Sequence, residues 1–112
     1  MIKFFKKIFT FVSSLNLFLS KLNEIKIQNG KILSEIKKNS TLANINETEF
    51  KVFSQFGEDG VIQYLINNLK ISKNCFVEFG VENYEEANTR FLLENNNWSG
   101  LIIDSSLKNI NY

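Results

Sequence analysis

Two carboxylates and a glycine stand where short apolar segments of this chain end. Glu78 and Gly80 close the segment CFVEFG, and Asp104 closes the segment LIID. A carboxylate only accepts hydrogen bonds, through two oxygens, and a glycine permits backbone angles that other residues avoid. These residue types suit a ligand-binding rim if the fold brings the two segment ends together.

The segments around these residues have the pattern of a strand, a helix and a second strand. Near-continuous apolar runs at about 75–79 and 100–104 are typical of strands buried on both faces of a parallel sheet. A polar turn and a helix of roughly ten residues separate them, which predicts a βαβ unit of a doubly wound α/β domain. Ligands of such sheets bind at the carboxyl ends of the strands. We therefore expect Glu78, Gly80 and Asp104 on one rim.

Length and composition limit the function classes. The 112 residues have room for one small domain, and no histidine is present, which excludes a Ser-His-Asp triad, a Cys-His pair and a His-ligated metal site. We predict no metal site. The single cysteine, Cys75, lies in an apolar strand and is predicted to be a buried structural residue, as fits a reducing cytoplasm.

Only two strands can be assigned from the sequence. The second would have an unpaired edge, which is an aggregation liability. We interpret the chain as a truncated part of a longer enzyme, and we expect it to be inactive by itself.

Charge divides the chain into two parts. Residues 1–38 hold eight lysines and two glutamates, a net charge of +6, whereas residues 39–112 hold five basic and ten acidic residues, a net charge of −5. A basic arm can bind anionic lipid, nucleic acid or the acidic remainder of its own chain. We expect no nucleic-acid partner.

An apolar stripe recurs through residues 1–38 at alternating steps of three and four residues, the spacing of an amphipathic helix. Its members are Phe4, Ile8, Phe11, Leu15, Phe18, Leu22, Ile25, Ile32 and Ile36, flanked by Phe5, Val12, Leu19 and Leu33. Asn29 occupies the one polar position of the register, as a coiled coil tolerates. Gly30 weakens a helix by about 1 kcal/mol relative to Ala. Residues 1–38 are therefore predicted to form one long helix or two helices joined at Asn29-Gly30.

Three functions compete for this amphipathic basic arm. It can pair with itself or with the rest of an intact protein, as a coiled coil does. Alternatively, Lys3, Lys6 and Lys7 beside phenylalanines can seat the helix on an anionic membrane surface, which would place the protein in the cytoplasm at the inner membrane face. A signal peptide is disfavoured because serines interrupt the apolar core and no small-x-small cleavage site follows. A membrane span is not expected, since about 20 apolar residues would be needed.

Two further segments precede the first strand. Residues 39–50, NSTLANINETEF, are polar and unpatterned and are predicted to be a linker. Asp59 is predicted to cap a helix from about Gly60 to Asn68. The apolar face of that helix would consist of Val61, Ile62, Leu65, Ile66 and Leu69.

Three segments in order, SQFGEDGVIQYLI, FVEFGVENYEEANTRFLL and NNWSGLIID, resemble the FkbM-like group of class I S-adenosylmethionine-dependent methyltransferases. The resemblance covers residues 51–112 and implies an incomplete Rossmann-like fold, the cofactor-binding front of such enzymes. It does not extend to residues 1–38.

The resemblance assigns S-adenosylmethionine as cofactor and gives four residues a role. Glu78, Gly80 and Val81 match the opening of the family's acidic-x-Gly-x-Gly-x-Gly loop, which implies that Glu78 sets the loop and the amino end of the cofactor. Asp104 matches the carboxylate that accepts hydrogen bonds from the ribose hydroxyls. Polar positions at the start of the following helix match Asn88 and Thr89. A recurrent patch before the first strand matches Ser54, Gln55, Glu58 and Asp59.

The chain departs from the family at two positions. Glu82 and Tyr84 stand where the fuller motif has its second and third glycines, and their side chains limit how closely backbone can approach a ligand. Glu82, Glu85 and Glu86 make the loop acidic. An acidic turn repels phosphates and tolerates a cationic sulfonium, so S-adenosylmethionine is favoured over NAD.

The predicted function is therefore that of the N-terminal part of a methyltransferase. The resemblance implies an oxygen of a sugar or other small molecule as methyl acceptor, and it names no catalytic residue. The alternative is a non-enzymatic interaction module, in which a coiled-coil or membrane-tethering helix precedes a remnant α/β segment.

Overall fold

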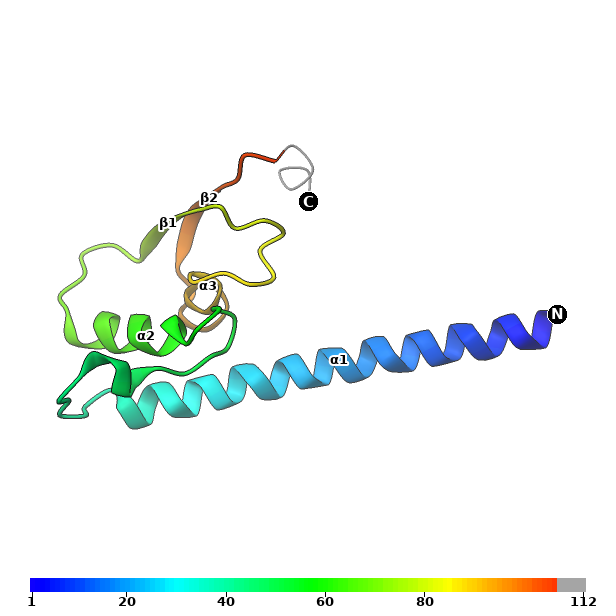
Figure 1. Cartoon of the computed structure of the whole chain (residues 1–112), viewed down its shortest axis with the longest axis horizontal. Helices are drawn as coiled ribbons and strands as arrows, with labels where there is room; N and C mark the ends of the chain where they lie inside the picture. The colour runs from blue at the N-terminus through cyan, green and yellow to red at the C-terminus, as the bar shows by residue number, and fades with distance from the viewer. Residues whose placement is uncertain (107–112) are drawn as a thin grey trace.

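The computed structural model describes residues 1–106 and shows a long N-terminal helix, two shorter helices and a two-stranded parallel sheet, broadly an α/β arrangement (Figure 1). The elements follow the order α1 (Ile2–Lys37), the 3-10 helix η1 (Ile45–Thr48), α2 (Glu58–Asn68), β1 (Cys75–Phe79), α3 (Arg90–Asn96) and β2 (Ser99–Ile103).

The N-terminal arm is one continuous helix of 36 residues, so the alternative of two helices is not observed. Its N-terminal part projects away from the rest of the molecule, and its C-terminal part lies beside α2 (Figure 1). Gly30 does not interrupt α1 because it lies against the core: a Cβ there would be 2.4 Å from Val52 Cγ2 and 2.9 Å from Phe91 Cζ. Its low helix propensity is offset by this close packing.

The core forms between α1, α3 and the segment that leads into α2. Phe50, Val52, Phe53 and Phe91 are buried and in contact, and Ile27 and Leu33 of α1 pack against them. The rings of Phe50 and Phe91 meet edge to face with centroids 6.1 Å apart. No strand residue belongs to this cluster.

A buried amide links the three α-helices. Ser34 Oγ of α1 donates to Gln63 Oε1 of α2 over 3.1 Å, and Gln63 Nε2 donates to Asn96 Oδ1 of α3 over 2.7 Å. Gln63 is 2% exposed, so both of its polar atoms need these partners.

Residues 39–50 contain more structure than an unpatterned linker. Asn44 and Glu47 form a reciprocal capping box around η1. Thr48, the last residue of η1, and Phe50 are buried.

Asp59 does not cap its own helix, contrary to our prediction. Helix α2 begins at Glu58, two residues before the predicted start at Gly60, and follows Gly57 with φ of 115°. The Asp59 carboxylate instead accepts hydrogen bonds from the backbone N–H groups of Val52, Phe53 and Ser54, each over 2.7 Å. The buried side of α2 therefore consists of Asp59, Gly60 and Gln63, while Leu65 and Leu69 of the predicted apolar face are exposed.

The two strands pair in parallel, with Cys75 opposite Ser99 and Phe79 opposite Ile103. The predicted strand–helix–strand order and the shared rim are thereby confirmed. The prediction of burial on both faces is wrong, since Val77 is 56%, Phe79 70% and Leu101 57% exposed. Cys75 is likewise exposed rather than buried. The physical reason is that the helices of residues 1–106 pack mainly on one another and leave the sheet uncovered (Figure 1).

Within residues 1–106, α1 and the shorter helices lack the combination of length and apolar character that crossing a bilayer requires.

Candidate functional site

The loop that follows β1 starts from the end of the sheet ladder. Gly80 N donates to Ile103 O over 2.9 Å, which holds the first loop residue beside the last residue of β2. Every second residue then has a positive φ: 68° at Gly80, 50° at Glu82 and 61° at Tyr84. Side-chain-bearing residues seldom adopt these angles, so the contacts of residues 80–89, which we call the open loop, must hold them in place.

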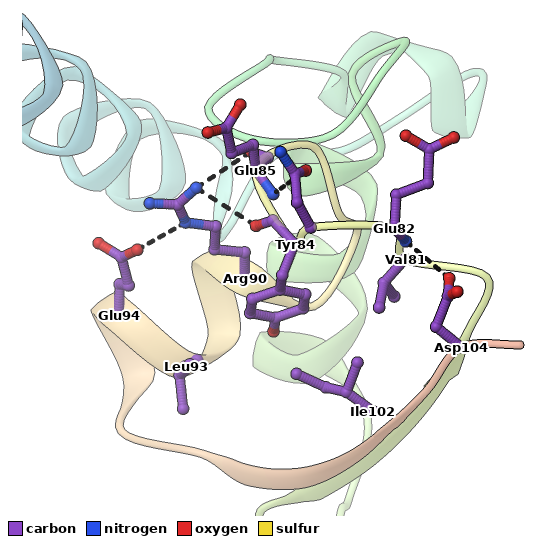
Figure 2. A pocket seen from close by; sticks show the side chains of 10 residues that line it. Val81, Glu82, Tyr84, Glu85, Arg90, Leu93, Glu94, Ile102 and Asp104 are labelled. Carbon is purple, nitrogen blue, oxygen red and sulfur yellow. Dashed lines mark hydrogen bonds and ion pairs between the residues drawn. The ribbon is translucent and has the colours of Figure 1, made fainter. Parts of the chain in front are cut away.

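Asp104 is one of these contacts. Its Oδ2 accepts a hydrogen bond from Glu82 N over 2.9 Å, and its Oδ1 accepts one from Ser106 N over 2.8 Å. The carboxylate at the end of β2 thus fixes the backbone of the open loop at one of its strained positions (Figure 2).

Glu78 holds the other end of the open loop. Its Oε1 accepts from Asn88 N over 2.8 Å, and its Oε2 accepts from Thr89 N over 3.0 Å and from the Thr89 hydroxyl. These donors precede the first turn of α3, where N–H groups have no intrahelical acceptor. Glu78 therefore acts as a cap for α3, supplied by the neighbouring strand.

Arg90 is a functional candidate that the sequence did not identify. Arg90 Nε and Glu94 Oε1, four residues apart on α3, form an ion pair over 2.7 Å. The guanidinium also donates to Tyr84 O over 3.3 Å and Glu85 O over 3.1 Å and lies 4.2 Å from the centroid of the Phe53 ring. Arg90 therefore joins the open loop to the core, and only the i, i+4 spacing was visible in the sequence.

A cavity of about 560 Å³ opens between the open loop, α3 and β2 (Figure 2). Val81, Leu93 and Ile102 give it an apolar wall. Among the residues that the structure describes, Glu82, Glu85, Glu94 and Asp104 add acidic groups and Arg90 adds a cation. Its size falls within the range of roughly 300–1,000 Å³ that small-molecule sites occupy. An apolar wall with a few charged groups can bind a ligand that combines a flat apolar part with positive charge or hydroxyl groups.

The predicted site residues are brought to one rim but divided among neighbouring hollows. Val81 and Asp104 line the main cavity. Gly80 and Val81 line a second hollow of about 500 Å³ together with Gln55. Glu78 and Gly80 line a third, again with Gln55. None of these three hollows of the described residues is lined by both Glu78 and Asp104.

Two titratable groups near the loop have shifted pKa values. Burial raises the pKa of the Tyr84 hydroxyl above its ordinary value of 10.0, so this phenol stays neutral and exchanges a hydrogen bond with Thr89 Oγ1 over 3.0 Å. Backbone hydrogen bonds, first at Glu58 itself and then from Phe56 N, lower the pKa of the Glu58 carboxyl below 4.5.

In comparisons with protein-family models, curated proteins and solved structures, this chain matched none.

Proposed function

We propose that residues 51–106 are the cofactor-binding front of an S-adenosylmethionine-dependent methyltransferase with a Rossmann-like sheet. The conformation of the open loop carries this proposal. Gly80, Glu82 and Tyr84 stand where the family has three glycines, and all three have positive φ. Glycine adopts a positive φ more readily than any other residue, so positive φ at all three positions is consistent with a glycine-rich loop and supports the proposal.

The cavity supports the same ligand. Asp104 follows β2 at the carboxyl end of the parallel sheet, where ligands of α/β domains bind. The apolar wall of Val81, Leu93 and Ile102 suits a flat base. The acidic groups suit a sulfonium and oppose the phosphates of NAD.

In this proposal Asp104 receives the ribose hydroxyls, while Gly80 and Val81 present backbone to the cofactor. Glu78 acts through the loop and the start of α3. The methyl acceptor is a sugar or small-molecule oxygen, by resemblance to the family, and a cytoplasmic location stays a prediction.

Isothermal titration of S-adenosylmethionine into the protein tests the proposal. We expect saturable binding that Asp104→Ala weakens by about 10- to 100-fold, the value of one or two hydrogen bonds to a charged group. Glu35→Ala, which removes an exposed carboxylate from α1, is the matched control and should bind as the wild type does. Equal affinity of wild type and Asp104→Ala would remove Asp104 from the site. Binding of NAD without binding of S-adenosylmethionine would overturn the proposal.

The second candidate is a non-enzymatic interaction module. It is favoured by one observation, the exposure of the apolar stripe along α1. A protein that binds no methyl donor but associates through α1 would support it.

A further inference from the structure

We propose that α1 pairs with α1 of a second copy of this chain, in parallel and in register, as a coiled coil. This inference is independent of the proposed function, because it concerns residues 4–36 and uses no residue of the cavity. Its first basis is the heptad repeat. The repeat's a positions are Ile8, Leu15, Leu22, Asn29 and Ile36, and its d positions are Phe4, Phe11, Phe18, Ile25 and Ile32.

The structure presents this heptad face, which we call the seam, as one uninterrupted surface. Helix α1 runs from Ile2 to Lys37 without a break, so all ten positions lie on a single helix. The nine apolar ones are 44–68% exposed. Nine large side chains that recur over five heptads form a contiguous apolar surface of the kind that marks an interaction site.

The rest of the molecule leaves room for a second helix. Gly30 and Ser34 are the buried residues of α1, and Ile27 packs beside them on the core. At about 100° per residue, the seam residues Ile25, Ile32 and Ile36 point roughly 120–180° away from Gly30 and Ser34 around the helix. A helix laid along the seam therefore lies on the side of α1 away from Gly30 and Ser34, and Leu33, at an e position, borders both the seam and the core.

Asn29 identifies the partner and its direction. Parallel, in-register pairing of two copies places a against a, so the Asn29 amide meets the Asn29 amide of the other copy. Every antiparallel arrangement places a against d, and all five d residues are Phe or Ile, which offer an amide no hydrogen bond. A single buried Asn at an a position favours two strands and fixes their register.

The charges beside the seam allow this arrangement. Parallel pairing brings Lys21 at a g position near Lys26 at the e position of the other copy. Lys21 already forms an ion pair with Glu24 of its own helix over 2.9 Å, and Lys26 lies over the Phe53 ring at 5.3 Å from its centroid. Both ammonium groups therefore have partners that reduce their repulsion.

The competing occupant is an anionic membrane, which Lys3, Lys6 and Lys7 could attract. A helix that lies on a membrane needs an apolar face but no heptad spacing. This stripe keeps the heptad spacing through Ile36, well past the basic cluster of Lys3, Lys6 and Lys7 and into the part of α1 that lies beside the core. The extended regularity favours a second copy.

Sedimentation equilibrium of the full chain tests the pairing with matched variants. Leu15 and Leu17 are exposed leucines of the same helical turn, but only Leu15 belongs to the seam. We expect the wild type to be dimeric, Leu15→Asp to weaken the dimer by about 100-fold or more, and Leu17→Asp to leave it unchanged. Circular dichroism checks that each variant remains helical. A monomeric wild type, or equal effects of the two substitutions, would overturn the proposal.

Disulfide trapping tests the direction. In a Cys75→Ser background, which removes the exposed native thiol, Leu22→Cys should yield a covalent dimer on mild oxidation, because Leu22 occupies an a position and Asn29 is kept. Asn23→Cys, at an exposed b position of the same helix, should not. Absence of the Leu22→Cys dimer would exclude in-register parallel pairing. A wild-type monomer that floats with phosphatidylglycerol vesicles would assign the stripe to a membrane instead.

Discussion

Two loops of this protein are organised by carboxylates, and they differ in what surrounds them. In the first, residues 50–60, which we call the closed loop, Asp59 is 1% exposed and binds three consecutive backbone N–H groups and the Ser54 hydroxyl. In the second, the open loop, Glu78 and Asp104 make the same kind of contact at partly exposed positions on the rim of the sheet.

The glycines of the two loops show the same difference. A Cβ on Gly60 of the closed loop would lie 2.0 Å from Thr48 O, whereas a Cβ on Gly80 of the open loop would have no atom within 4 Å. The first glycine is required by packing and the second by its φ of 68°. The closed loop therefore serves the fold, and the open loop keeps free space where a ligand can approach.

The largest effect is expected from Asp59→Ala. This substitution leaves three buried N–H groups without their acceptor, so the free energy of unfolding should fall by about 3–5 kcal/mol. Urea unfolding followed by circular dichroism measures the loss. Asp59→Asn, which keeps one oxygen acceptor, should lose less. Similar stability of wild type and Asp59→Ala would contradict the structural role of the closed loop.

Gly60→Ala should destabilise the protein by about 1–3 kcal/mol, although alanine is the better helix former, because its Cβ would collide with backbone of the preceding segment. Thermal unfolding of this variant measures the effect. A gain in stability would show that the segment around Thr48 can move away from α2. It would contradict the tight packing that we assign to the closed loop.

Gly80→Ala is the counterpart in the open loop. Only the positive φ opposes it, so we expect a loss of about 1 kcal/mol in the same unfolding measurement. Affinity for S-adenosylmethionine should fall as well, since the new methyl group enters the hollow that Gly80 lines. A loss of stability larger than that of Gly60→Ala would show that the open loop is the more tightly packed of the two.

The smallest effect is expected on the stability of the protein at acidic pH. Because the pKa of Glu58 is lowered in the folded protein, the unfolded chain binds more protons below 4.5, and stability falls as the pH drops through the folded-state pKa. The side chain is only partly buried and solvent screens its charge, so the effect should be small. Glu58→Gln should flatten the pH dependence of the thermal midpoint on the acid side and leave it unchanged at neutral pH. An unchanged acid profile would show that Glu58 adds nothing to the loop.

The sequence predicted elements with strong periodicity and failed where long-range contacts decide. The heptad spacing indicated the helix of residues 1–38, and apolar runs bounded by polar turns indicated β1 and β2 with their common rim. The spacing could not decide between one helix and two at Gly30, because a glycine in a helix is unfavourable until a neighbour such as Val52 packs on it. The predicted burial of Cys75 was wrong because an apolar strand is buried only where helices cover the sheet.

The candidate site was predicted in part for the same reason. Asp104 and Val81 could be assigned to the rim from the ends of the strands. The role of Asp59 in the closed loop and that of Arg90 in the open loop depend on atoms five or more residues away and on the path of the backbone between them. A local motif carries no information about that path.

The buried Gln63 amide gives α1 a mechanical connection to the rim. One end of this side chain is attached to Ser34 and the other to Asn96, at the last turn of the helix that carries Arg90 and Leu93. Rotating the long arm about its axis would therefore pull on α3 and alter the shape of the cavity wall. A partner that binds the N-terminal part of α1 could therefore change the shape of the proposed methyl-donor pocket.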